Sequence, residues 1–363
     1  MRIAQLVNRV QPAYGGVSRA VDRLGQGYAE RGHTRLVIRP GAEDTVETTA
    51  AGTVVTIASP TRVSGHRIIT NLRKVAQVLD RFGPDSVEVS DKATLAASCL
   101  WARRRGVGSV LVSHERLDDL ASLFLELEVS REVHVLNRWL ARTYDKIVVT
   151  TRYSAGEWIN TKAKLAVVPF GVDVSQFADR NGPREPGTAL RLIHVGRLSR
   201  EKSPHLAVAT AVELERRGVD VQLNVYGAGP HADELRTLAG GAPVFFHGYV
   251  DSRAALAAEY RAADIALSVC PAEAFGLAAL EALACGTPVV TADRGGAREL
   301  VDASCAEWGS PDPVFLADAV QRLAARLGRD EAGVRQAARA CAERYPWETA
   351  ITAMLAVHQQ VAG

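Results

Sequence analysis

The 363-residue chain has no long apolar run. A helix that spans a membrane needs about 18 to 20 consecutive apolar residues, so we expect none here. The N-terminal segment is interrupted by Asn8, Arg9 and Pro12 and lacks the apolar stretch of a secretory signal. We therefore interpret it as a first strand and expect a cytoplasmic protein.

Cysteines are few and scattered. The five residues share no Cys-x-x-Cys spacing, which argues against a structural zinc site, and their odd number argues against a disulfide framework. We expect reduced, buried thiols and no metal site. The cysteines are Cys99, Cys270, Cys285, Cys305 and Cys341.

A large charge excess is also absent, since the formal net charge is +2. The charge is nevertheless uneven: residues 1–170 hold 24 Lys+Arg and 17 Asp+Glu, whereas the remainder holds 19 and 24. The basic first half suits an anionic partner such as a membrane surface, unless both halves simply present solvated faces. No basic patch is interleaved with aromatic residues, so nucleic-acid binding is not expected.

Strand-length apolar runs alternate with helix-length segments along the chain, which indicates βαβ units and parallel sheets covered on both faces. The expected strands are 2–8, 34–39, 54–58, 86–90, 109–114, 146–150, 191–196, 221–226, 244–246, 264–269 and 288–291. The clearest expected helices are 16–31, 67–82, 204–217, 252–263, 277–284 and 348–360.

The alternation pauses at residues 172–189, where Pro, Gly and polar residues show no periodicity. Because the chain is too long for one core, we predict an α/β protein with two Rossmann-like, doubly wound parallel-sheet domains, 1–171 and 172–344. The ligand is expected in the interdomain cleft. The terminal segment 345–363 is broken by Pro346 and is expected to return to the first domain.

The most informative segment is Glu-Ala-Phe-Gly-Leu-Ala-Ala-Leu-Glu at 273–281. It follows an apolar strand, and the Phe275-Gly276 turn leaves backbone N–H groups at a helix start, which favours an anion or a hydroxyl-rich ligand. Glu273 and Glu281 can both face that ligand and accept hydrogen bonds from vicinal hydroxyls. Spacing alone leaves equally open a capping role for Glu273 and a solvated Glu281.

A basic loop, Gly-Arg-Leu-Ser-Arg-Glu-Lys at 196–202, follows the first strand of the second domain. Arg197 and Lys202 can stabilise the charge that develops on a diphosphate leaving group without a metal. Taken alone, the segment fits an ordinary basic loop better.

Two weaker signals lie in the first domain. Gly15 and Gly16 stand between the first strand and the first helix, where glycine lets the backbone approach a phosphate or a sugar. His114 ends a strand and is expected to face the cleft, although a lone histidine is more often structural.

Together these segments resemble the family-4 glycosyltransferases of the GT-B fold, along nearly the whole chain. The motif at 273–281 is specific when paired with the motif at 196–202. Residues 169–173 resemble the family's interdomain crossover. Residues 295–301 resemble its late loop, although Arg298 stands where the family commonly has proline.

The resemblance implies a retaining hexosyltransferase that needs no metal and no cofactor besides its nucleotide-sugar donor. Its implied catalytic residues are His114, Arg197, Lys202 and Glu273. Its implied donor-binding residues are Gly15, Gly16, Val250, Phe275, Gly276, Leu277 and Glu281, with Val250 in the loop near the base.

A narrower likeness lies in Glu88–Asp91 and Ser113–Asp118, which resemble the actinobacterial mannosyltransferases that build phosphatidylinositol mannosides. It implies GDP-mannose as donor, a lipid-linked or glycan acceptor, and a peripheral place at the inner face of the plasma membrane. The basic run 103–105 and the stretch 120–140 are candidates for contact with an anionic membrane, although 120–140 also fits a core helix.

Alternative functions remain. A UDP-sugar-dependent transferase acting on a small molecule or a polysaccharide would carry the same motifs. A non-catalytic sugar-nucleotide-binding protein could dispense with Arg197 and Lys202. A dehydrogenase is disfavoured because the first strand lacks Gly-x-Gly-x-x-Gly and residues 227–230 lack the third glycine. An epimerase of the same fold is a closer rival; a phosphorylase would need a pyridoxal phosphate lysine, for which no segment is seen.

Overall fold

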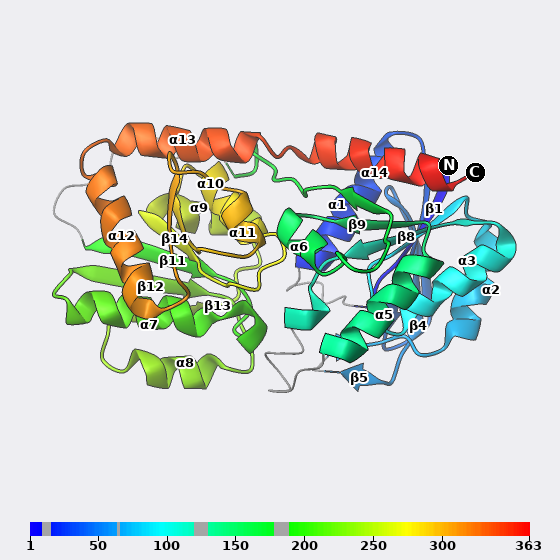
Figure 1. Ribbon diagram of the computed structural model, residues 1–363, viewed down its shortest axis with the longest axis horizontal. Helices are drawn as coiled ribbons and strands as arrows, with labels where there is room; N and C mark the ends of the chain where they lie inside the picture. Colours follow the sequence, from blue (N-terminus) through cyan, green and yellow to red (C-terminus); the bar gives the residue numbers. More distant parts are fainter. Residues whose placement is uncertain (9–15, 64–65, 120–129, 178–188) are drawn as a thin grey trace. The chain divides into compact units, whose positions relative to one another are not determined.

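The computed structural model shows a chain of two units, each with its own parallel sheet (Figure 1). It describes residues 1–8, 16–63, 66–119, 130–177 and 189–363. One unit contains Met1–Phe170 and Trp347–Gly363, and the other contains Gly171–Pro346. The sequence places these boundaries after residues 171 and 344. The predicted α/β class with two doubly wound, Rossmann-like sheets is confirmed.

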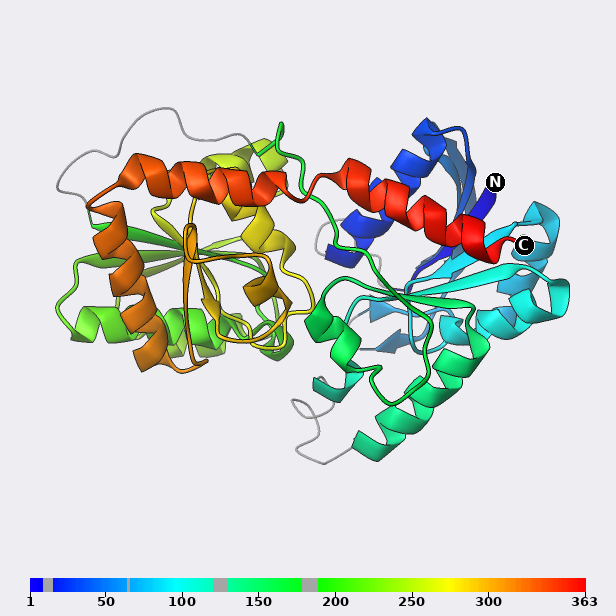
Figure 2. The same ribbon diagram turned by 45° about the horizontal axis from the view of Figure 1, so that its top comes forward.

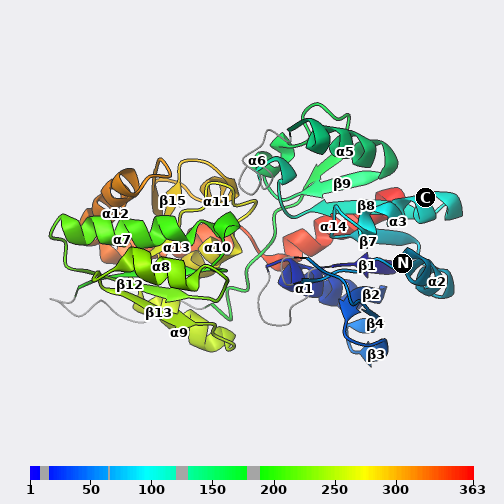
Figure 3. The same ribbon diagram turned by 90° about the horizontal axis from the view of Figure 1, so that it is seen from below.

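The first unit contains an eight-stranded sheet in the order β10-β9-β8-β7-β1-β2-β4-β3 (Figure 3). Its strands are β1 (Arg2–Leu6), β2 (Thr34–Gly41), β3 (Thr45–Thr49), β4 (Gly52–Ala58), β7 (Ser86–Val89), β8 (Gly108–Ser113), β9 (Lys146–Val149) and β10 (Leu165–Val167). All neighbours run parallel except β3, which pairs antiparallel with β4. A separate small pair joins β5 (Arg62–Val63) and β6 (His66–Arg67).

Helices cover this sheet because each buries one apolar stripe. Helix α14 (Trp347–Val361) crosses α1 (Gly16–Glu30), as Figure 2 shows, and Gly27 of α1 leaves room for Ile351. The main core of the unit also includes side chains from α2 (Leu72–Phe82), α3 (Ser98–Arg105) and α5 (Ser130–Thr143). The short helices are η1 (Leu95–Ala97) and α6 (Arg152–Gly156).

The structure corrects the expected start of one helix and adds strands to those expected, β3, β5, β6 and β10. The helix expected at 67–82 begins only at Leu72, because Asn71 caps it by accepting a hydrogen bond from the Lys74 N–H. Strand β3 was not expected, because all five of its residues are exposed and it buries no alternating face.

The second unit contains a six-stranded parallel sheet in the order β13-β12-β11-β14-β15-β16. Its strands are β11 (Leu190–Val195), β12 (Val221–Tyr226), β13 (Val244–Gly248), β14 (Ile265–Ser268), β15 (Val289–Ala292) and β16 (Ala306–Gly309). Its helices are η2 (Arg200–Lys202), α7 (Pro204–Arg216), α8 (Ala232–Ala239), α9 (Arg253–Ala262), α10 (Leu277–Ala284), α11 (Gly296–Glu299), α12 (Pro313–Leu327) and α13 (Glu331–Glu343).

Two helix layers enclose this sheet. Helix α7 packs against α8 and α12, and α10 packs against α9 and α13; Figure 1 shows α7 and α13 on opposite sides of the strands. The two stretches of chain that join the units also pair within the second unit, where the Val172 N–H donates to the Tyr345 carbonyl at 2.9 Å. Strands β11, β14 and β15 are adjacent and parallel. The loops that follow their carboxyl ends therefore lie at one edge of the second sheet.

Candidate active site

The loops that follow β14 and β15 are packed together through glycine. A Cβ on Gly296 would lie 2.2 Å from the Ala274 carbonyl oxygen, and a Cβ on Gly295 would lie 2.8 Å from that of Pro271. The Gly296 N–H donates to the Glu273 carbonyl. Only glycine allows this approach, so the late loop holds the backbone that carries Glu273.

Lys202 and Glu273 meet at this edge, although they are far apart in the sequence. The Lys202 ammonium donates to both carboxylate oxygens of Glu273, at 3.1 Å and 2.9 Å. Their side chains are 38% and 19% exposed, so both remain accessible to a ligand. Lys202 ends a short 3-10 turn, and Ser203 after it has a φ of 47°, a strained value for a residue other than glycine.

Arg197 lies beside a second carboxylate, that of Glu201. One guanidinium nitrogen is 3.5 Å from a Glu201 oxygen, to which the Ser199 hydroxyl also donates at 2.6 Å. Burial would raise the pKa of Glu201, but the Ser199 hydrogen bond and the charges of Arg197 and Lys202 bring it below its usual value. Both predicted cations thus face carboxylates of the chain itself.

The Gly227-Ala228-Gly229 segment supports the loop that carries Arg197. Leu198 donates its N–H to the Ala228 carbonyl at 3.1 Å. A Cβ on Gly227, whose φ is 135°, would lie 1.9 Å from the Gly196 oxygen, and one on Gly229 would lie 2.2 Å from the Leu198 oxygen. These glycines therefore serve close backbone packing.

Helix α10 begins where the sequence predicts it. Gly276, at φ 108°, is its N-cap and has no side chain with which to cap the helix. A Cβ there would lie 2.9 Å from that of Ala297. The ring of Phe275 is buried and contacts Tyr345 edge-on at 6.5 Å. Phe275, Gly276 and Leu277 can therefore offer mainly backbone groups to a ligand, with the positive end of the helix dipole behind them.

Glu281 is buried and ion-paired, so the alternative of a solvated Glu281 is wrong. One Glu281 oxygen lies 3.0 Å from a guanidinium nitrogen of Arg253, the first residue of α9. Arg253 also stacks over the Phe177 ring at 4.8 Å and donates to the Gln176 side chain at 3.2 Å. Arg253 is not among the residues predicted from the sequence, although a positive charge at a helix N-terminus is unfavourable and is therefore a detectable signal.

Val250 lies half-buried in the loop between β13 and α9. Nearby, the ring of Tyr226 stacks on His247 with centroids 4.6 Å apart, and its hydroxyl donates to Glu259 at 2.6 Å. This stack connects β12, β13 and α9, the elements that flank the loop expected to hold the base.

The remaining predicted residues belong to the first unit. His114 directly follows β8 rather than ending it, and its Nε2 shares a hydrogen bond with the Ser90 hydroxyl at 2.9 Å. Its ring lies 5.6 Å from that of Phe170. Gly16 is the exposed first residue of α1, and Gly15 lies outside the described residues. The roles of these residues stay predictions.

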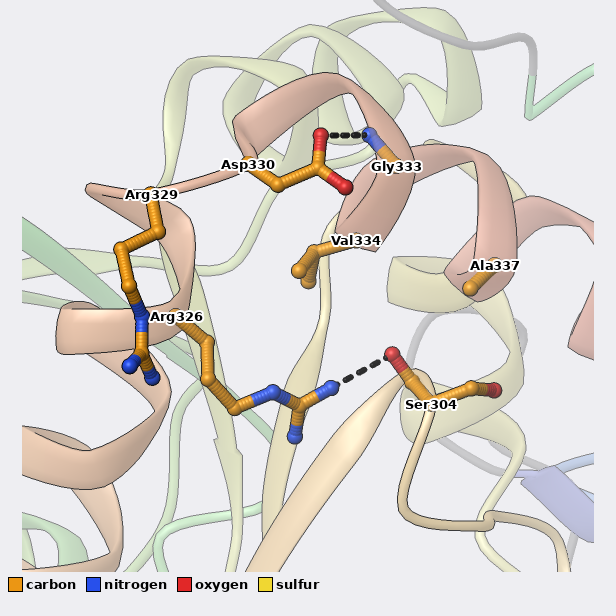
Figure 4. Close-up of a pocket in the computed structure, with 7 residues that line it drawn as sticks. All are labelled: Ser304, Arg326, Arg329, Asp330, Gly333, Val334 and Ala337. Atoms are coloured by element: carbon orange, nitrogen blue, oxygen red, sulfur yellow. Dashed lines mark hydrogen bonds between the residues drawn. The ribbon is translucent and has the colours of Figure 1, made fainter.

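A hollow of about 340 Å³ in the second unit lies away from these residues (Figure 4). It is lined by Ser304, Arg326, Arg329, Asp330, Gly333, Val334 and Ala337. Arg326 donates to the Ser304 carbonyl at 2.7 Å, and Asp330 accepts from the Gly333 N–H at 2.8 Å (Figure 4). The first contact joins the segment before β16 to the last turn of α12, and the second caps α13, so both support the fold.

Neither a metal cluster nor a spanning helix is found in the described part of the chain. No three His, Cys, Asp or Glu side chains among those residues are grouped to hold an ion. None of the described helices is both long and apolar enough to cross a bilayer. Whether the reaction needs a metal stays a prediction.

Comparison with known proteins identifies the family. The family described as glycosyltransferase family 4 matches residues 14–176, and the family described as glycosyl transferases group 1 matches residues 189–326. The chain is 36% identical, over 98% of its length and 95% of the relative's, to a GDP-mannose-dependent alpha-(1-6)-phosphatidylinositol dimannoside mannosyltransferase of Mycobacterium tuberculosis. It is 35% identical, over 60% of its length and 57% of the relative's, to a D-inositol 3-phosphate glycosyltransferase of Xylanimonas cellulosilytica.

Solved structures share the fold of the whole chain at low identity. Sucrose-phosphate synthase from Thermosynechococcus elongatus has a TM-score of 0.79 at 21% identity, with 99% of this chain and 98% of that chain covered. HepE of Anabaena, solved with UDP and glucose, has a TM-score of 0.76 at 18% identity, with both chains fully covered. With both halves matched and the charged loops assembled at one sheet edge, the chain belongs to the family-4 glycosyltransferases of the GT-B fold.

Proposed function

We propose that the chain transfers mannose, with retention of the α configuration, from GDP-mannose to a lipid-linked acceptor of the phosphatidylinositol mannoside class. The choice of donor and acceptor is supported by the 36% identity, over 98% of the chain, to a relative whose name states both. The site supports this choice of chemistry, because two cations, two carboxylates and a helix start suit a sugar diphosphate.

Binding of the donor would redistribute the ion pairs at this edge of the sheet. Lys202 and Arg197 already lie beside carboxylates. A diphosphate carries more negative charge than one carboxylate and would therefore compete with these carboxylates for the two cations. Once Lys202 turns to the diphosphate, Glu273 is released to accept hydrogen bonds from hydroxyls of the transferred sugar. Glu281, oriented by Arg253, would take the ribose hydroxyls.

The chemical step follows from this placement of charge. The acceptor oxygen bonds to the anomeric carbon on the face that the diphosphate leaves, and a donor phosphate oxygen takes the acceptor proton. The bond from the anomeric carbon to phosphate oxygen breaks, and its electron pair stays on the GDP. Arg197, Lys202 and the first N–H groups of α10 would stabilise that negative charge, so we propose that no metal is required.

For the lipid-linked acceptor, we propose that the protein docks peripherally on an anionic membrane through the α3–α5 surface, defined as Leu100, Arg103–Arg105, Val135, Arg138, Trp139 and Arg142. Helices α3 and α5 pack side by side. Leu100, Val135 and Trp139 are 40%, 60% and 38% exposed, and the arginines around them are exposed as well. Exposed apolar groups among arginines suit the lipid interface. Residues 120–129 of the stretch expected at the membrane lie outside the described residues.

A thermal-shift screen of GDP-, UDP- and ADP-sugars tests the donor, because a ligand that binds the folded state raises its melting temperature. We expect selective stabilisation by GDP-mannose, followed by transfer of radiolabelled mannose to phosphatidylinositol mannosides. Selective stabilisation by a UDP-sugar would instead support the alternative transferase. Stabilisation without turnover on any acceptor would support a binding protein.

Vesicle co-sedimentation tests the membrane proposal. An Arg138→Ala, Trp139→Ser variant should bind anionic vesicles less than the unaltered chain at low salt. A matched variant with Arg236→Ala and Leu238→Ser, on exposed positions of α8, should bind as the unaltered chain does. Equal binding of both variants would reject the α3–α5 surface.

A further inference from the structure

A buried ion pair in the first unit joins the loop after β7 to helix α6. The Lys92 ammonium lies 2.5 Å from a carboxylate oxygen of Glu157, the C-cap residue of α6. The two side chains are 7% and 1% exposed. The ammonium also lies over the Trp158 ring, 5.1 Å from its centroid. Such a pair is costly to desolvate and is often no more stable than an apolar pair of the same volume, so its use here points to a geometric role.

Both partners hold the segment that directly follows His114. Lys92 donates to the Glu115 carbonyl at 2.6 Å, and the Leu117 N–H donates to the other carboxylate oxygen of Glu157 at 2.9 Å. The pair therefore grips the chain on both sides of residue 116. Since His114 precedes the held carbonyl by one residue, its backbone has little freedom to move.

Two further contacts stiffen the same segment. Asn137 of α5 donates to Glu157 at 3.2 Å, which fixes the carboxylate from a second helix. Arg116 donates to the Tyr153 carbonyl at 3.0 Å and lies 2.5 Å from a carboxylate oxygen of Asp118. The loop after β8 is thus tied to α5, α6 and the loop after β7.

We propose that Lys92 and Glu157 are positioning residues for glycosyl transfer: their ion pair fixes the segment from His114 to Leu117 and thereby sets the orientation of the His114 imidazole against Ser90. This inference rests on the proposed function, with His114 as one of the catalytic residues that the family resemblance implies. A displacement of a reacting group by about 1 Å can slow an enzyme by about 10²-fold, so a loop held this firmly suits such a task.

The test uses the full chain with both charges removed by Lys92→Met and Glu157→Gln. Replacing a buried pair by uncharged groups of similar volume tends to preserve stability, and the glutamine can still accept from Leu117 and Asn137. We expect kcat to fall about 10- to 100-fold with an unchanged donor KM and a near-normal melting temperature, because the charged groups proposed to hold the donor lie in the second unit. The exchange rate of the amides of residues 114–117 should rise in the same variant.

A double-mutant cycle with His114→Ala separates positioning from plain support. If the ion pair acts through His114, removing it in the His114→Ala background should cause no further loss of kcat. Additive losses, or an unchanged kcat in the charge-free variant, would overturn the inference. The matched control is Glu88→Gln, a buried carboxylate of the same unit that contacts α1 and α14, which should alter stability and leave kcat unchanged.

Failure of the proposed function is visible separately. It appears as the absence of mannose transfer by the unaltered chain, whereas failure of this inference appears in the cycle and in amide exchange. Unchanged exchange at residues 114–117 in the charge-free variant would refute the grip on this loop even in a chain with no measurable activity.

Discussion

Two clusters of polar side chains, one in each unit, are placed very differently. In the second unit, Arg197, Lys202 and Glu273 stand in loops at the carboxyl edge of the sheet, and their charges remain partly exposed. In the first unit, Glu88 is fully enclosed and accepts hydrogen bonds from Gln5 at 2.8 Å, Tyr28 at 2.9 Å and His358 at 3.1 Å. The exposed groups are poised to exchange partners with a ligand, whereas the enclosed Glu88 network holds the first unit together.

The largest effect is expected when either member of the exposed Lys202–Glu273 pair is removed. Lys202→Ala and Glu273→Ala should each lower kcat about 10²- to 10³-fold, by analogy with the loss of one preorganised donor at a developing charge. Melting temperatures should change little, because partly exposed ion pairs contribute little stability. Steady-state kinetics with GDP-mannose measures the effect.

The control for that pair is Arg200→Ala, an exposed cation on the same short turn as Lys202. It should turn over as the unaltered chain does. A loss equal to that of Lys202→Ala would show that general basicity of the loop, rather than the Lys202–Glu273 pair, serves the reaction.

The enclosed network should show the opposite pattern. His358→Ala removes one donor from a buried carboxylate and should destabilise the first unit by about 3 kcal/mol, with kcat per folded molecule unchanged. Urea unfolding of the two proteins measures the difference. A large kinetic effect with full stability would contradict a purely structural role for the Glu88 network.

Because of the same network, we expect the folded state to lose stability at acid pH. Burial would raise the pKa of Glu88, but the hydrogen bond and charge of His358, with the Gln5 and Tyr28 hydrogen bonds, bring it below its usual 4.5. A depressed carboxyl pKa adds stability above the unfolded-state value, and this is lost as pH falls through the folded-state pKa. Glu88→Gln should therefore flatten the loss of stability below pH 4.5. An acid limb as steep as that of the unaltered chain would contradict this assignment.

The contrast between units also explains what the sequence could predict. Residues 196–202 and 273–281 can be recognised as short local motifs. Each runs from the end of a strand into the helix that follows, and this local order alone places its charges and N–H groups at the carboxyl edge of the sheet. Lys202 and Glu273, one from each motif, form a hydrogen-bonded ion pair in the structure. Buried contacts carry no such local signal: Glu88 and His358 are 270 positions apart and meet only when the terminal helix docks.

A smaller effect is expected at Arg253, which shares features of both units because it is half-exposed yet pairs with the buried Glu281. Arg253→Met should weaken donor binding about tenfold, or ~1.4 kcal/mol, since Glu281 loses the partner that orients it. Calorimetric titration with GDP measures this. Arg236→Met, a matched change on α8, should bind GDP normally, and equal losses in both would reject a specific role.

The smallest effect should come from Tyr226, whose hydroxyl connects β12 to Glu259 of α9. Tyr226→Phe keeps the ring stacked on His247 and removes one hydrogen bond, so the second unit should lose about 1 kcal/mol of stability. No charge is uncovered, and kcat should not change. If the variant instead loses donor affinity at full stability, the hydroxyl serves the base-binding loop, and the second unit then uses its half-buried contacts for recognition as well as its exposed ones.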